Sequence, residues 1–191
     1  MVNTFLPYSD FKRCAKVLDY KRLGKQRVEA KQIIDILENY EALAKTLSIP
    51  YNDNITEYMK SIYNAYKSLN YLYIKNNDKV EKFNVDIQQP GKLIILKGFA
   101  FHPAVKMWFN HIDALKLYVN VMITEWIFRG YKNTMLIYTL PNNIIMPKWL
   151  GNKKFHHSHQ KSLLVKAPEH YKSLFKYKKL PTNYEYIWPV K

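Results

Sequence analysis

Apolar and aromatic side chains return every three or four residues over two long stretches of the chain, which is the period of an α-helix. One stretch covers residues 55–73 and the other covers residues 102–126, where a proline stands at a position acceptable for a first helical turn. Strand signals are few. The best of them, residues 93–96, belongs to a short hairpin that we predict near residues 85–97. The pattern therefore predicts a mainly α, helical fold.

Capping residues and glycines predict where the helices begin and end. Ser9 or Asp10 can cap a first helix, because their side chains accept hydrogen bonds from first-turn amides, and we predict that this helix runs from 10 to 46. Gly24 lies inside it at a cost of about 1 kcal/mol relative to alanine, so the helix bends there or a phosphate or second helix approaches closely. Shorter helices are predicted over 156–165 and 168–175.

The length and apolar content of the chain predict one compact domain over residues 1–191. With 48% hydrophobic and 15% aromatic residues, a chain of 191 residues can bury a sizeable core. Residues 75–91 are polar and contain a Pro-Gly break, so we expect them to form a surface excursion.

The charge balance points to a polyanionic partner. Thirty Lys and Arg residues stand against fifteen Asp and Glu residues, which gives a net charge of +15. Such a surplus repels itself in the compact state and attracts nucleic acid. The alternative is compositional, since lysines also accumulate in proteins from AT-rich genomes, and this chain is rich in Lys, Asn, Ile and Tyr.

Cysteine content and hydropathy predict an intracellular protein. Cys14 is the single cysteine, so no internal disulfide can form, and a reducing compartment fits. The N-terminal residues lack a signal-peptide pattern, and no stretch approaches the roughly 20 apolar residues that cross a bilayer. We expect a location in the cytoplasm or nucleus, with a viral origin or a place in a virion left open, and no secretion or membrane partner.

A stripe of polar residues on the first helix is the best candidate for chemistry. At about 100° per residue, one sector of the helix holds Arg22, Lys25, Gln26 and Glu29, whereas Arg27 projects elsewhere. The alternative interpretation is an exposed face with ordinary ion pairs such as Lys25 with Glu29, worth a few tenths of a kcal/mol.

The α-amine of the second residue is a candidate nucleophile to act together with this stripe. Val2 is small enough for Met1 to be removed, which would expose an α-amine with an ordinary pKa of about 7.7–8.0. Arg22 and Lys25 would lower that pKa and free the lone pair for attack on a sugar C1′ to form an imine. Glu29 is the candidate to handle protons as the sugar ring opens and during any later β-elimination.

Two histidines near the C-terminal end form a second candidate cluster. His156 and His159 share one helical face with Gln160, so they could contact phosphate, donate protons or form a structural hydrogen-bond network. A zinc site is the weakest interpretation, because no further ligands stand at a readable spacing. We predict neither a metal nor another cofactor, and we expect the four tryptophans to serve the core rather than base stacking.

Several blocks, taken in order along the chain, resemble one family of small proteins. They are Asn3-Thr4-Phe5-Leu6-Pro7-Tyr8, Val17-Leu18-Asp19, the run from Lys21 to Glu29, the run from His102 to Trp108, Glu125-Trp126 with Arg129-Gly130-Tyr131, and Trp149-Leu150-Gly151 with Phe155-His156. This set is similar to bacterial and viral relatives of the pyrimidine-dimer DNA glycosylases of the endonuclease V type. Residues 46–95 look longer than is usual in that family, and we expect a variable excursion there.

The resemblance implies a compact, mainly α fold that excises a damaged or modified pyrimidine from double-stranded DNA after flipping the base out. By position, Val2 would be the amine nucleophile, Glu29 the acid and base, and Arg22 a site arginine, with AP-lyase activity as a second step. The residues expected to contact DNA are Lys25, Gln26, Arg27, Lys106, Arg129, Lys132, His156, His159 and Lys161.

Two other functions compete with this one. A non-catalytic, basic DNA-binding or packaging protein on the same scaffold would need only the charge. A nuclease built on His156 and His159 is the weaker competitor and would be sensitive to EDTA. No glycine-rich nucleotide-binding loop supports an ATP-driven enzyme.

Overall fold

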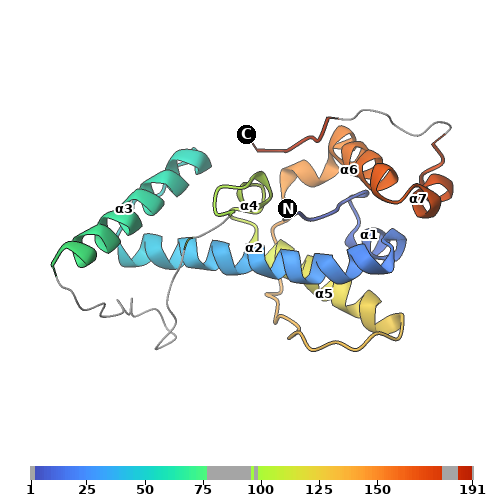
Figure 1. Ribbon diagram of the computed structural model, residues 1–191, viewed down its shortest axis with the longest axis horizontal. Coiled ribbons are helices and arrows are strands. Elements are labelled where there is room, and N and C mark those ends of the chain that lie inside the picture. Colours follow the sequence, from blue (N-terminus) through green and yellow to red (C-terminus); the bar gives the residue numbers. More distant parts are fainter. Residues whose placement is uncertain (1–2, 77–95, 97–98, 178–184, 191) are drawn as a thin grey trace.

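The computed structural model describes residues 3–76, 96, 99–177 and 185–190, and these are helical without any strand (Figure 1). The predicted mainly α fold is confirmed for this part of the chain. The predicted hairpin near 85–97 lies almost wholly outside the described residues, as does most of the predicted excursion. The helices are α1 (Phe11–Val17), α2 (Tyr20–Thr46), α3 (Ile55–Asn76), α4 (Pro103–Lys106), α5 (Ile112–Phe128), the 3-10 helix η1 (Lys148–Gly151), α6 (Lys153–Lys166) and α7 (Pro168–Phe175).

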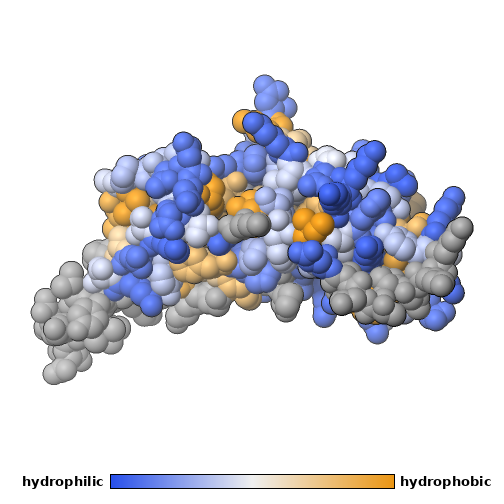
Figure 2. Space-filling model, turned by 90° about the horizontal axis from the view of Figure 1, so that it is seen from above, coloured by the Kyte–Doolittle hydropathy of each residue, from blue (hydrophilic) through white to orange (hydrophobic). Residues whose placement is uncertain are grey.

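Helices α2 and α5 lie side by side and form the centre of the molecule (Figure 1). Helix α1 packs on α5, α3 and α4 pack on α2, and α7 packs on α6. Trp108 and Tyr118 are fully buried in the core, where Phe11 contacts both rings edge-on. The face seen in Figure 2 is largely hydrophilic with separate apolar patches, as expected when most apolar side chains are used between helices.

The predicted single helix over 10–46 is wrong, because the chain breaks at Leu18 and Asp19. Asp10 caps α1, and Asp19 takes an extended conformation and caps α2 by accepting hydrogen bonds from the amides of Lys21 and Arg22. An aspartate that caps a helix in this way starts a new one, since it satisfies donors that have no partner within the helix.

Gly24 is explained by the close approach of a second helix, which was one of the two partners predicted for it. A Cβ atom at this position would lie 3.0 Å from Cζ3 and 3.2 Å from Cη2 of Trp126, on α5. Helix α2 continues through Gly24. Glycine here therefore lets the indole lie directly against the α2 backbone.

The other predicted helices are confirmed, with one difference. The run over 102–126 divides into α4 and α5 around a turn in which Asn110 has a φ of 64°. Helix α5 ends at Phe128 with Arg129 as its C-cap, followed by Gly130 with a φ of 84°, a left-handed conformation suited to glycine. Within the described ranges, none of the helices is long and apolar enough to span a membrane. The division of the chain into domains stays a prediction.

Candidate active site

The N-terminal segment, residues 3–7, runs through the protein without regular secondary structure and is buried along its length. Buried backbone groups must find hydrogen-bond partners, and a segment outside helices and sheets takes them from side chains. Here the partners come from α2, α5 and α6. We call these side chains the clamp: Gln26, Glu29, Tyr118, His156, His159 and Gln160.

Helix α2 holds the beginning of this segment. The backbone amide of Asn3 donates to Oε2 of Glu29 over 3.2 Å, and the amide of Phe5 donates to Oε1 of Gln26 over 2.6 Å. Nε2 of Gln26 in turn donates to Oε2 of Glu29 over 3.3 Å, and the Tyr118 hydroxyl donates to Oε1 of Gln26 over 2.8 Å. Gln26 and Glu29 thus share the face predicted for them, and the chain entering that face is the N-terminal segment.

Helix α6 holds the end of the segment. The Leu6 amide donates to Nδ1 of His159 over 3.0 Å, and Nε2 of Gln160 donates to the Pro7 carbonyl over 2.8 Å. His156 places its Nδ1 2.7 Å from the Leu6 carbonyl, and its other ring nitrogen contacts the Leu150 carbonyl. The structural hydrogen-bond network predicted as one alternative for this pair is therefore what the structure shows.

His159 is held in its neutral form. Because Nδ1 accepts the Leu6 amide, the ring proton belongs on Nε2, which is buried with no partner among the described residues. Complete burial, reinforced by the nearby His156, places the pKa of His159 well below its ordinary value of 6.5. Both imidazoles are buried and contact backbone groups of the N-terminal segment, so a nuclease based on this pair gains no support from the structure. In the described part of the chain, no group of three His, Cys, Asp or Glu residues could hold a metal ion.

The C-terminal tail closes the clamp from outside. The side-chain amide of Asn3 donates to the Tyr186 hydroxyl, which also lies 3.1 Å from Nδ1 of His159. The Ile187 amide donates to the Ser158 hydroxyl over 3.3 Å and ties the tail to α6. Sequence reasoning missed Asn3 and Tyr186 as site residues, because a lone tyrosine near a chain end carries no recognisable signal.

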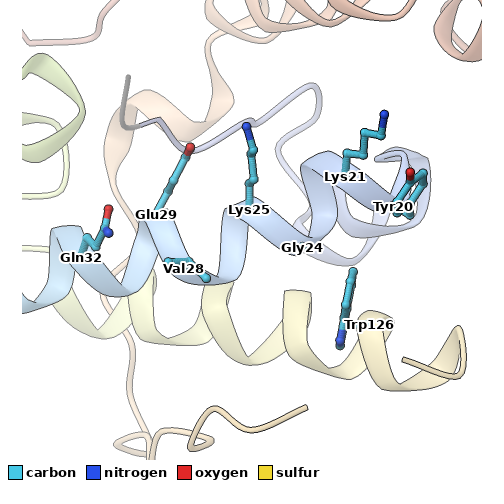
Figure 3. Close-up of a pocket in the computed structure, with 8 residues that line it drawn as sticks. All are labelled: Tyr20, Lys21, Gly24, Lys25, Val28, Glu29, Gln32 and Trp126. Carbon is cyan, nitrogen blue, oxygen red and sulfur yellow. The ribbon is translucent and has the colours of Figure 1, made fainter. Parts of the chain in front are cut away.

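Glu29 borders an open pocket of about 470 Å³ along α2, to which α5 contributes Trp126 (Figure 3). Its lining residues are Tyr20, Lys21, Gly24, Lys25, Val28, Glu29, Gln32 and Trp126. Burial raises the pKa of the Glu29 carboxyl above its ordinary value of 4.5, against the opposing effects of the Asn3 hydrogen bond and the Lys25 charge. A carboxyl with a raised pKa beside an open pocket is suited to accept and return a proton.

The arginines predicted for this site are largely engaged with the protein. Arg22 pairs with Asp19 over 2.8 Å and donates to the Lys166 carbonyl over 3.0 Å, while its buried Nε has no partner among the described residues. Arg27 projects away from the stripe as predicted, and it lies 4.0 Å from the Trp126 ring centre with a hydrogen bond to Asn133.

Arg129 joins two helix ends instead of presenting a free guanidinium. It pairs with Glu125 over 2.8 Å and donates to the carbonyls of Ala15, Lys16 and Leu18 at the end of α1. Those carbonyls have few partners within a helix, so the arginine satisfies them. Arg129 thus caps α5 and also places a positive charge at the negative end of α1.

The lysines predicted to contact DNA are spread over the surface. Lys25 lines the Glu29 pocket, Lys132 is exposed beyond the end of α5, and Lys106 and Lys161 are half-buried on α4 and α6. The structure brings Lys25, Gln26 and Glu29 together. Val2, the predicted nucleophile, lies outside the described residues, and the DNA-contacting roles stay predictions.

A family model for pyrimidine dimer DNA glycosylases matches residues 2–139, which include the N-terminal segment, α2 and α5. Neither a curated protein nor a solved structure gave a significant match to the chain. The match indicates a DNA repair glycosylase in general terms, with DNA as the substrate. It covers most of the chain, including Glu29 and the stripe around it, and on this basis the protein belongs to the pyrimidine dimer DNA glycosylase family.

Proposed function

We propose that the protein excises a damaged pyrimidine from double-stranded DNA through an imine formed by the amine of Val2. The observation that carries this proposal is the 3.2 Å hydrogen bond from the Asn3 amide to Glu29. Residue 2 is bonded to that amide nitrogen, and standard bond lengths keep its own nitrogen within about 4 Å of it. An amine at residue 2 would therefore lie within about 7 Å of the carboxylate, close enough for proton exchange directly or through one or two waters.

The proposed reaction balances with these two groups and one proton from solvent. The Val2 amine attacks C1′, and the bond from C1′ to the base breaks, with its electron pair leaving on the base, which takes a proton from solvent. Glu29 then accepts a proton from the attacking nitrogen. The nitrogen lone pair forms a C=N bond as the bond from C1′ to the ring oxygen opens, and Glu29 returns its proton to that oxygen.

An AP-lyase step would follow from the same imine. Loss of a proton from C2′ allows the bond from C3′ to its phosphate oxygen to break by β-elimination, which cuts the strand. Glu29 is the group we assign to this proton as well. A flipped-out nucleotide is required throughout, because C1′ cannot be reached within a stacked duplex.

Trapping with borohydride tests the proposal. Reduction of the imine should link the protein covalently to ultraviolet-irradiated duplex and to abasic duplex, with the adduct at residue 2. Cleavage of the glycosidic bond at the lesion in the irradiated duplex would identify glycosylase activity. Val2→Leu supplies a matched control, since a larger second residue leaves Met1 in place and displaces the amine. An adduct that forms equally in this variant, or at a lysine, would overturn the assignment of Val2.

The same experiment addresses the competing proposal of a non-catalytic DNA-binding or packaging protein, which the charge of +15 favours. Such a protein would bind DNA with a steep dependence on salt and would form no adduct. Blocking its N-terminus would leave DNA binding unchanged.

The location inside a cell also stays a prediction.

A further inference from the structure

Three side chains form a stacked column next to the Glu29 pocket. The guanidinium carbon of Arg27 lies 4.0 Å from the Trp126 ring centre, and the Tyr131 ring lies 4.2 Å from it at an angle of 27°. Two groups this close to one ring cannot share a face, so Arg27 and Tyr131 cover opposite faces of the indole. Neither face of Trp126 is therefore available to stack on a DNA base. Tyr131 forms the outer end of the column.

Hydrogen bonds and close packing hold Trp126 and Arg27 of the column in place. Nε1 of Trp126 donates to the Lys132 carbonyl over 2.9 Å, and Arg27 donates to the Asn133 side chain over 2.9 Å. Gly24 leaves room for the indole against α2. An aromatic surface whose position is fixed in this way loses little conformational entropy when a ligand stacks on it.

The outer end of the column is open to solvent. Tyr131 is 38% exposed, and Tyr20 is 53% exposed, with its ring 6.5 Å from that of Tyr131 and inclined by 29°. The Lys21 ammonium lies 5.8 Å from the Tyr20 ring, and Lys132 is exposed next to Tyr131. Exposed aromatic rings among cations are the combination that binds unpaired nucleotides, with rings for the bases and charges for the phosphates.

We propose that Tyr131 and Tyr20 form a stacking platform for an unpaired DNA base, a proposal that takes its choice of DNA from the proposed function. Both Tyr20 and Glu29 line the same pocket, and Gly24 and Lys25 lie between them along α2 (Figure 3). Tyr20 and Glu29 are nine positions apart on α2, which corresponds to about 14 Å along the helix axis at 1.5 Å per residue. The platform therefore contacts a base other than the one being excised, and it serves to grip locally opened DNA.

Binding measurements on two DNA substrates test the platform without relying on catalysis. The substrates are a fully paired duplex and the same duplex with a short unpaired bubble. Stacking is worth about 1–3 kcal/mol per base, so Tyr131→Leu should weaken binding to the bubble by about 5- to 150-fold and binding to the paired duplex by less than about twofold. Tyr20→Leu should act in the same direction, whereas Tyr131→Phe, which keeps the ring, should bind like the unchanged protein.

Tyr51→Leu is the matched control, because Tyr51 is also exposed but lines a different pocket, near α3. Thermal unfolding of each variant checks that the fold is kept, and Tyr20→Leu tests the platform if Tyr131→Leu unfolds. Equal losses on both DNA substrates, or no loss on either, would overturn the platform. If the unchanged protein forms the Val2 imine while Tyr131→Leu binds the bubble normally, the platform proposal is overturned and the proposed glycosylase function is kept. If the unchanged protein binds neither substrate, both proposals fail.

Discussion

Asn3 and Glu29, 26 positions apart, meet through a backbone hydrogen bond of 3.2 Å between the N-terminal segment and α2. The bond brings the start of the described chain to a half-buried carboxyl whose pKa burial raises. Because Gln26 contacts both the Phe5 amide and Glu29, the segment and the carboxyl are fixed relative to each other.

Glu29→Gln should abolish turnover while leaving DNA binding largely intact. Glutamine can still accept the Asn3 hydrogen bond, but it cannot take up and return a proton. General acid–base catalysis contributes about 100- to 10,000-fold, and the rate of glycosidic-bond cleavage should fall by that amount. Single-turnover cleavage of the glycosidic bond and equilibrium binding are the two measurements. Asp35→Asn, at an exposed ion pair with Lys31 on α2, should change neither, and an unchanged rate in Glu29→Gln would remove this residue from the mechanism.

Tyr186→Phe should slow imine formation more than it weakens DNA binding. The substitution keeps the ring but removes the hydroxyl that contacts both Asn3 and His159. We expect a loss of about 1 kcal/mol in unfolding free energy. We also expect roughly tenfold slower borohydride trapping at saturating DNA, because the segment carrying the amine is less constrained. Tyr177→Phe, at a half-buried position outside the clamp, is the control. Equal trapping rates in both variants would mean that the tail does not position the N-terminal segment.

Gly24→Ala should destabilise the protein even though alanine is the better helix former. The added methyl would lie 3.0 Å from Trp126, whose two faces are already covered. Overpacking costs about 1–3 kcal/mol and helix propensity returns up to about 1, so we expect a net loss of up to about 2 kcal/mol in chemical denaturation. Gly151→Ala is the control, since a Cβ there meets nothing within 4 Å. A stability gain in Gly24→Ala would show that Trp126 moves aside without cost.

Acid should destabilise the protein partly through His159. Its pKa is far below 6.5 in the folded state, so between that lowered value and pH 6.5 the unfolded chain binds more protons than the folded one. Its contribution to stability is thus complete above pH 6.5 and is lost as the pH falls, by at most about 1.4 kcal/mol per pH unit. The measurement is the unfolding free energy at pH 7.5 and at pH 5.

His159→Asn isolates this contribution, because its side-chain oxygen can replace Nδ1 as an acceptor but does not titrate. The difference in stability between the two pH values should be smaller in the variant. Burial also lowers the pKa of His102 and His111, and both residues are kept in the variant, so they do not enter the comparison. An identical pH dependence in both proteins would contradict the neutral, buried state assigned to His159.

Local patterns predicted the helices and part of the α2 stripe. Apolar spacing located α3 and the α5 region, and the angle per residue placed Gln26 and Glu29 on one face with Arg27 on another. The same patterns missed the break at Asp19. A run of good helix formers fits one long helix as well as two successive helices, and here Asp19 caps the second helix and so starts it.

The period of a helix and the chemistry of its side chains depend on residues close together in the chain. The sequence by itself therefore predicts a mainly α protein with a polar stripe on its first long helix. The partners of that stripe depend on packing between distant elements. Leu6 meets His159 across 153 positions, and Asn3 meets Tyr186 across 183. Only the packing of the helices shows that His156 and His159 hold the buried N-terminal segment, because its backbone groups need partners that no local rule supplies.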